Sequence, residues 1–266
     1  MRIFNPEHNE LGLPMENTFC VADELNYIVS SGYITYSHLP LLFPERPISI
    51  YLNIQTQGIG LDMLMGALIA RAEIIREQFR QIPCRIFTRI DPQDEKLLQY
   101  LYSEGFDTTD SLDLYQLNFP DAKNGAPMGY QLGTVPLNSQ QEVYALLQRL
   151  NSFKMNVISI SLFQRLMQTP HFSVFYIAKE NEIVGEIVLA GQDNIAKVIA
   201  LYIQPKYQKM GMAKTLLYNS MLALNQRGVN YFEGEVIRRN FRQNKLAQSC
   251  KATFIHTLFQ YPGINI

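Results

Sequence analysis

Apolar residues recur along the second half of the chain with the spacings of alternating helices and strands. Val143, Leu146, Leu147 and Leu150 lie three or four positions apart, which predicts an amphipathic helix. Apolar runs on either side of the polar turn at residues 179–182 predict strands. The expected elements are strand 130–136, helices 140–150 and 159–168, strands 173–178, 183–190 and 195–203, helix 211–227, strand 230–237, helix 242–251 and strand 254–261. This order predicts an α/β (mixed α+β) fold with a mixed sheet flanked by helices.

The first half of the chain repeats the later part of this order. FCVADE at residues 19–24 corresponds to FYIAKE at 175–180, and LNIQ at 52–55 corresponds to LYIQ at 201–204. A long helix over 61–79 matches 211–227, a strand over 84–90 matches 230–237, and LYQL at 114–117 matches LFQY at 258–261. These pairs predict a degenerate tandem repeat. The segment FPDAKNGAPMG at 119–129 is typical of a linker, which divides the chain into domains 1–124 and 125–266.

Composition adds a charge asymmetry to this picture. The chain has 266 residues, 47% of them hydrophobic, which excludes a disordered chain, and its net charge is −1. Residues 1–125 hold 9 Lys and Arg against 17 Asp and Glu, for a net charge of −8, whereas the remainder holds 14 against 7, for +7. The cationic half suits an anionic ligand, and two ordinary domains are the alternative. Nothing global predicts binding to nucleic acid or to an anionic membrane.

The three cysteines indicate no disulfide framework. Cys20, Cys84 and Cys250 are far apart and form no CxxC pair, so we expect no structural metal and a reducing, cytoplasmic setting. The first ten residues lack the apolar run of a signal peptide, and no stretch approaches the ~18 apolar residues of a membrane helix. A soluble monomer or homodimer is the expectation.

The strongest chemical signal is LYIQPKYQKMGMAKTLL, at residues 201–217. It predicts a strand, a proline, a cationic loop, a glycine and then a helix. The first N–H groups of a helix have no internal partners and carry partial positive charge, so this arrangement suits an anion. Gly211 lets a phosphate approach the backbone, while Lys206, Lys209 and Lys214 add positive charge. The pattern is neither a P-loop nor the dinucleotide GxGxxG motif.

These residues resemble the signature of the GNAT N-acetyltransferase superfamily, Q/R-x-x-G-x-G/A after a strand that ends near a proline. In this chain the signature is Gln208, Lys209, Met210, Gly211, Met212 and Ala213. The element order over about 140 residues agrees with the family fold as well, so the resemblance implies two tandem GNAT-like halves.

The resemblance also implies a coenzyme site for acetyl-CoA as cosubstrate, without a metal. Residues 208–213 would hold the pyrophosphate through backbone amides, and Lys214 and Thr215 would extend that contact. The strand backbone at Leu201, Tyr202 and Ile203 would pair with the pantetheine arm. Asn240 matches an asparagine that meets the pantetheine or thioester, and Asn244 is its rival for that role.

The chain departs from the family pattern in two informative places. A tyrosine that often protonates the leaving thiolate is replaced by Ser249, and the Gly-Phe after it by Thr253-Phe254. In the first half, an offset of 149 residues places Ile59 at Gln208, Asp62 at Gly211 and Leu64 at Ala213. Because a carboxylate at a helix start repels a diphosphate, we expect the first half to bind no coenzyme.

Three carboxylates are candidates for removing the proton of an acceptor amine. Glu233 and Glu235 alternate onto one face of the strand at 230–237, beside the expected thioester position, and Glu186 on a neighbouring strand is the reserve. The alternative is a pair of internal salt bridges to Arg238 or Arg239.

The resulting hypothesis is an N-acetyltransferase that transfers acetyl directly to a primary amine of a small molecule or peptide. The acidic first half favours cationic acceptors such as polyamines, aminoglycosides or amino-acid amines. Direct transfer excludes an acyl-enzyme, so Cys250 is expected to be a packing residue. The alternative function is a non-catalytic acyl-CoA-binding or regulatory module.

Overall fold

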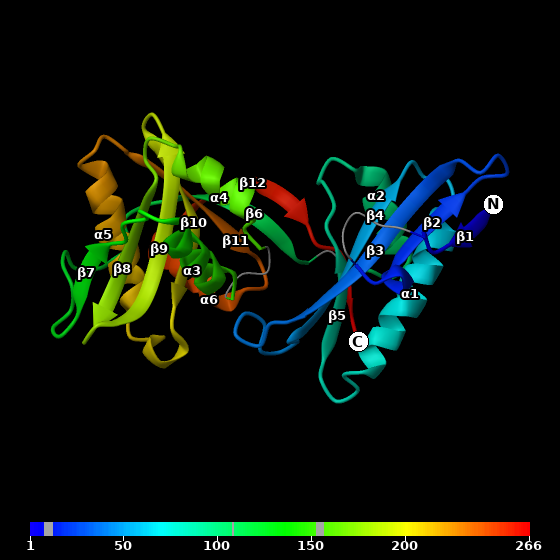
Figure 1. Ribbon diagram of the computed structural model, residues 1–266, viewed down its shortest axis with the longest axis horizontal. Coiled ribbons are helices and arrows are strands. Elements are labelled where there is room, and N and C mark those ends of the chain that lie inside the picture. Colours follow the sequence, from blue (N-terminus) through cyan, green and yellow to red (C-terminus); the bar gives the residue numbers. More distant parts are fainter. Residues whose placement is uncertain (8–12, 108, 153–156) are drawn as a thin grey trace. The chain divides into compact units, whose positions relative to one another are not determined.

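The computed structural model describes residues 1–7, 13–107, 109–152 and 157–266, and it divides into two compact units (Figure 1). The first unit contains Met1–Ser111 and Leu258–Ile266, and the second contains Leu112–Thr257. Among the described residues, no helix is both long and apolar enough to cross a membrane.

The first unit is a six-stranded sheet with two helices on one face. Its strands lie in the order β1-β2-β3-β4-β5-β13, and only the β4–β5 pair is parallel. The apolar faces of both helices pack into a single core cluster against the sheet. The elements are β1 (Arg2–Phe4), a 3₁₀ turn (Met15–Asn17), β2 (Thr18–Ala22), β3 (Ile28–His38), β4 (Ile48–Thr56), α1 (Leu61–Glu77), β5 (Cys84–Thr88), α2 (Glu95–Ser103) and β13 (Gly263–Asn265).

The second unit is a seven-stranded sheet with helices on both faces. Its order is β12-β6-β11-β10-β9-β8-β7, and β10 and β11 are parallel. One core cluster lies between the sheet and α5, and a second lies between the opposite face and α3 with α4. The elements are β6 (Ser111–Leu117), β7 (Gln131–Thr134), α3 (Gln140–Asn151), α4 (Ile160–Met167), β8 (Ser173–Lys179), β9 (Glu182–Gln192), β10 (Ile195–Ile203), a 3₁₀ turn (Pro205–Tyr207), α5 (Met212–Asn225), β11 (Tyr231–Ile237), α6 (Phe241–Ser249) and β12 (Thr253–Gln260).

The two units contain the same succession of elements, as the tandem repeat predicted. Three antiparallel strands lead into a helix, a parallel strand and a second helix in both: β2-β3-β4-α1-β5-α2 and β8-β9-β10-α5-β11-α6. Several ends follow local signals. Ser139 and Glu142 form a capping box at the start of α3, and Gly228, with φ of 93°, follows the end of α5.

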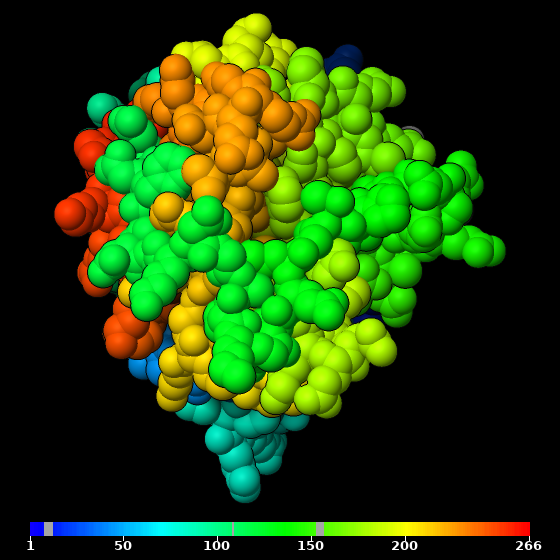
Figure 2. Space-filling model, turned by 90° about the vertical axis from the view of Figure 1, so that its left-hand side faces the viewer, coloured from blue at the N-terminus to red at the C-terminus, as the bar shows by residue number. Residues whose placement is uncertain are grey.

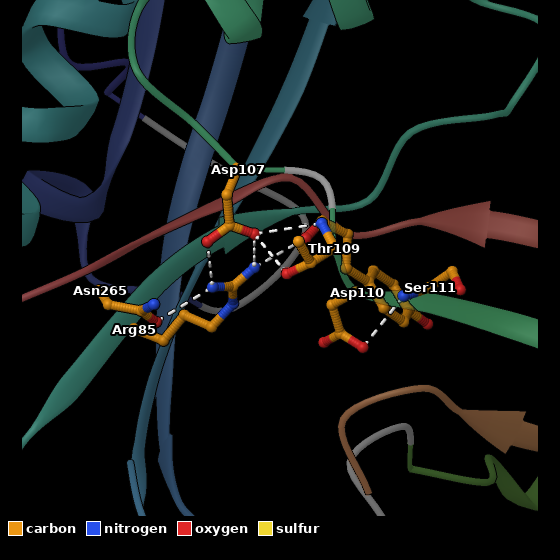
Figure 3. A network of polar contacts seen from close by, with 7 residues as sticks. Arg85, Asp107, Thr109, Asp110, Ser111 and Asn265 are labelled. Atoms are coloured by element: carbon orange, nitrogen blue, oxygen red, sulfur yellow. Dashed lines mark hydrogen bonds and ion pairs between the residues drawn. The ribbon is translucent and has the colours of Figure 1, made fainter.

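The chain passes between the units at other points than the predicted boundary at 124/125. β6 pairs with β11 in the second sheet, whereas β13 returns to pair with β5 in the first. The buried guanidinium of Arg85 fastens that returning strand, because it donates to the side chains of both Asp107 and Asn265 (Figure 3). The compact units therefore change at 111/112 and again at 257/258.

The segment predicted as a linker, residues 119–129, packs on the second unit. The ring of Phe119 lies edge-on to Tyr218 and Phe232, with centroids 5.6 and 6.0 Å away. The Gly125 N–H donates to Oδ1 of Asn219 at 2.8 Å. In Figure 2 this green segment lies against the yellow and orange surface of α5. The prolines and glycines here shape a surface segment within one unit.

Candidate coenzyme and acceptor site

The parallel strands β10 and β11 pair over only part of their length. Their Cα partners run from Ile195↔Tyr231 to Val198↔Gly234. Between Val198 and Ala200 a β-bulge interrupts the pairing of β10 with β9, after which β10 continues along β9 to Ile203. A bulge bends a strand and raises its twist, so the strands diverge from this point.

The loop after β10 has two residues in the left-handed backbone region. Lys209 has φ of 63°, and Gly211, with φ of 81°, caps α5. A Cβ on Gly211 would meet no atom within 4 Å, so the glycine is required by its backbone conformation and borders open space. The Gln208 side chain donates to the Ile203 carbonyl at 2.9 Å and ties the loop to the strand end.

Backbone donors converge at the start of α5. The first bond along the helix runs from the Thr215 N–H to the Gly211 carbonyl, at 3.1 Å. Among the described residues, the N–H groups of residues 209–214 have no hydrogen-bond acceptor. The first turn of α5 contains no acidic residue. Unsatisfied amides at the positive end of a helix form a binding site for an anion such as a diphosphate.

The three predicted lysines differ in whether their charge is available to bind an anion. Lys206 pairs with Glu182 at 2.6 Å, so its charge is largely compensated. Lys209 and Lys214 form no ion pair within the described part of the chain. They are the two lysines of the loop that can add charge to the amide cluster.

Asn240 and Asn244 both stabilise the connection between β11 and α6. Asn240 is buried, and its side-chain oxygen accepts from the N–H groups of Arg242 and Gln243 at 3.1 and 3.2 Å. Nδ2 of Asn244 donates to the carbonyls of Ile237, Arg238 and Asn240. The two asparagines therefore have a structural role in this connection, and their contact with the coenzyme stays a prediction.

The two predicted carboxylates on β11 have different surroundings. Glu235 pairs with Lys197 on β10, with Nζ and Oε1 2.6 Å apart. Glu233 lies beside Lys197 in the strand register and is half-buried. Its side chain forms no hydrogen bond or ion pair with the residues that the structure describes. The expected partner Arg238 instead donates to Asp113 at 3.0 Å, so that part of the salt-bridge alternative is wrong.

Comparisons with known proteins agree with this geometry. The family model described as "Acetyltransferase (GNAT) domain" matches residues 136–244. The second unit contains a GNAT acetyltransferase domain. Such a domain is an acyltransferase domain with acetyl-CoA as cosubstrate. A search of curated proteins found no match.

Solved structures show the fold of the whole chain. A GCN5-related N-acetyltransferase from Sphaerobacter thermophilus is similar at 13% identity and a TM-score of 0.51, over 96% of this chain and 82% of that one. One from Anabaena variabilis has 13% identity and a TM-score of 0.55, over 95% of this chain and 63% of that one. At these identities the likeness shows a GNAT fold that includes both units.

Within the GNAT domain, the reserve carboxylate Glu186 is fully buried and already engaged. Its two oxygens accept from Nε and Nη2 of Arg149, both at 2.8 Å, and Oε2 also accepts from the Tyr202 hydroxyl. Burial, together with Glu186, raises the pKa of Tyr202. A carboxylate held in this way is a poor acceptor for a substrate proton, so its geometry favours a positioning role. The sequence held one sign of the Arg149 contact. An acidic residue within an apolar strand requires a cationic partner when it is buried, although the sequence does not say which one.

The loop before α1 has the same backbone form as the GNAT coenzyme loop. Gly60, with φ of 73°, caps α1 just as Gly211 caps α5. Matching these caps gives an offset of 151 residues, so the offset of 149 is wrong by two. Gln57 then corresponds to Gln208, and Asp62 to Ala213.

This first-unit loop is nevertheless closed to a phosphate. A Cβ on Gly60 would lie 2.7 Å from Cγ1 of Val21, and the Gly58 N–H already donates to the Thr56 hydroxyl. Asp62 adds a negative charge to the first turn of α1. These contacts support the prediction that the first unit binds no coenzyme.

Cys250 is fully buried at the end of α6, and burial raises the pKa of its thiol. A protonated, enclosed thiol is a poor nucleophile. Among the described residues, no group of three or more His, Cys, Asp or Glu side chains could hold a metal ion.

Proposed function

We propose that this protein transfers the acetyl group of acetyl-CoA directly to a primary amine of a small molecule or peptide. The observation that carries the proposal is the diverging strand pair β10–β11, together with the glycine-capped helix α5 that follows β10 after a short loop. The first amides of this helix have no acceptor among the described residues. The match of residues 136–244 to an acetyltransferase domain supports the same reaction class.

The residues present fit the coenzyme. The amides of residues 209–214 would hold its diphosphate, with Lys209 and Lys214 adding charge. The backbone of β10 at residues 201–203, which lies beyond the register that β10 shares with β11, would pair with its amide-rich arm. When bound, acetyl-CoA supplies the thioester whose acetyl group is transferred. The absence of acidic residues in the first turn of α5 removes the repulsion that Asp62 causes in the first unit.

Glu233 is the proposed general base. An amine with an ordinary pKa near 10 is protonated at neutral pH and must lose a proton before it can attack. Glu233 shares a sheet face with Lys197 and Glu235 but has no described ion-pair partner, so its carboxylate can accept that proton directly or through water. Glu235, whose Oε1 pairs with Lys197, would hold the ammonium through its other carboxylate oxygen before the proton leaves.

Ser249 does not take over the role of the missing tyrosine. The Ser249 hydroxyl donates to the Leu246 carbonyl at 2.7 Å and is thereby directed into its own helix. The leaving thiolate belongs to a thiol with a pKa of about 8.5, so water can protonate it. Cationic amines such as polyamines, aminoglycosides or amino-acid amines are the proposed acceptors, because Glu233 and Glu235 present two carboxylates on one face of β11.

The test is a release assay for free thiol with acetyl-CoA and a panel of amines. Thiol release that requires a particular amine supports the proposal. Tight binding of acetyl-CoA without turnover across the panel would instead support the non-catalytic module.

A matched pair of variants tests the coenzyme site. Gly211 and Gly228 flank opposite ends of α5, both with positive φ and with open space where a Cβ would lie. Gly211→Leu should abolish coenzyme binding in calorimetry, whereas Gly228→Leu, with similar backbone strain, should preserve it. Two sites per chain, or equal affinities of the two variants, would refute the assignment.

A second pair tests the base. Glu233→Gln should lower kcat at neutral pH by roughly 10²-fold, the usual contribution of a general base, and leave coenzyme affinity unchanged. Glu235→Gln should mainly raise the KM for the amine. Wild-type rates for both variants over the whole pH profile would place the base elsewhere.

A further inference from the structure

A groove of about 350 Å³ lies between α1 and α2 of the first unit, next to β13. Its lining combines apolar side chains, among them Ile69 and the buried Phe106, with the polar residues Asp62, Tyr100 and Glu104. The volume is in the range of small-molecule sites. The proposed acetyl transfer does not use this groove.

The polar residues of the groove form a group with uncompensated negative charge. Asp62, Tyr100 and Glu104 line the same groove, and burial, Asp62 and Glu104 together raise the pKa of Tyr100. The negative charges of both carboxylates therefore disfavour ionisation of the same phenol hydroxyl. Neither Asp62 nor Glu104 forms an ion pair with any residue that the structure describes.

Two residues of the groove break local rules of helix stability. Gly66 lies inside α1, although glycine is among the poorest helix formers, and a Cβ there would meet nothing within 4 Å. Packing therefore does not require this glycine. Glu104 caps the carboxyl end of α2, where the helix dipole disfavours a negative charge. Such departures are expected at functional sites.

The second unit shows that the fold does not need this groove. Matching the helix caps Gly60 with Gly211, and Asp94 with Asn240, places Leu217 at Gly66 and Cys250 at Glu104. Leu217 and Cys250 are buried in an apolar cluster. The same pair of helices thus closes with apolar side chains in one unit and stays open and acidic in the other.

We infer that this groove binds a small organic diamine. One ammonium group would lie between Asp62 and Glu104 beside the Tyr100 ring, and the alkyl chain would follow Ile69 and Phe106. The space left by Gly66 admits the chain. This site is separate from the proposed acetyl transfer and does not depend on it.

The experiment is calorimetry of the full chain with 1,5-diaminopentane, in the absence of acetyl-CoA. Glu104→Gln and Asp62→Asn should each weaken binding by about tenfold, the size expected for one charge-assisted contact. The control Glu73→Gln removes the same charge from an exposed position of α1 and should leave the affinity unchanged. The uncharged 1,5-pentanediol should not bind.

Gly66→Leu provides a variant that should fold, because it fills open space and improves a helix. It should abolish diamine binding while preserving coenzyme binding. Absence of diamine binding in the wild type, or unchanged binding in Gly66→Leu and Glu104→Gln, would overturn the inference. Loss of binding in Glu233→Gln instead would place the amine at the acceptor site, which overturns the groove assignment and supports acetyl transfer.

Discussion

The returning strand β13 offers a quantitative test of the first unit, because one buried cation fastens it. Arg85 is 4% exposed, and its terminal nitrogens donate to both oxygens of Asp107, at 3.1 and 3.2 Å. Nη1 also donates to Oδ1 of Asn265 at 3.0 Å (Figure 3). Nη2 donates to the Tyr261 carbonyl at 3.2 Å. Asp107→Asn would leave a buried guanidinium with neutral acceptors only.

The expected loss follows from burial. Removing one partner of a buried ion pair costs about 3–5 kcal/mol, and the Asp107 side chain is 38% exposed, so water can replace part of its contact. We therefore expect about 3 kcal/mol, at the lower end. A double variant, Arg85→Met with Asp107→Asn, should cost less than the sum of its parts, because it leaves no buried charge.

The pH dependence has a definite sign. Burial raises the pKa of Asp107, but hydrogen bonds from Arg85 and Thr109 outweigh it and hold the pKa below its ordinary value. A lowered pKa means that the stabilisation is complete above the ordinary carboxyl pKa of about 3.9 and is lost as the pH falls through the lowered value. Asp107→Asn should abolish this acid sensitivity.

Hydrogen exchange of β5 and β13 peptides is the appropriate assay, since a chain of two units need not unfold in one step. The control is Glu77→Gln, which breaks the exposed ion pair with Arg80 in the same unit and should leave this exchange unchanged. Equal protection of β13 in the wild type and in Asp107→Asn would refute the reasoning.

Three further predictions concern the second unit. Cys250→Ala should retain acetyl transfer, and an acetylated Cys250 found by mass spectrometry would contradict direct transfer. Arg149→Met should destabilise α3 by about 3 kcal/mol, because it leaves the fully buried Glu186 without its cation. Glu186→Gln should cost less, because the partly exposed Arg149 can turn to water. Hydrogen exchange of α3 measures both losses, and the reverse order would contradict the argument. Asn240→Ala should destabilise α6 by about 1 kcal/mol, because it removes the side chain that caps the helix. Asn240→Asp should not, because aspartate is also a good N-cap residue. Hydrogen exchange of α6 measures both, and an equal loss in the two variants would exclude a capping role.

Local patterns in the sequence determined most elements of the second unit and its coenzyme loop. Period and capping signals predicted α3 and α5 to within two residues, and the strand, proline and glycine spacing predicted the loop that ends at Gly211. These features depend on near neighbours in the chain, which is why a sequence can specify them. The tandem order of the two halves was predictable for the same reason.

Only the tertiary structure decided which distant residues meet. It placed β6 beside β11 in the second sheet and β13 beside β5 in the first. It also brought Arg149 to Glu186 and Lys197 to Glu235, and it packed the predicted linker on α5. It also matched Gly60 with Gly211, which a sequence offset had misplaced by two residues. Partners of this kind are chosen by sheet order and burial, since a buried carboxylate requires a cation but its own sequence neighbourhood does not say which one.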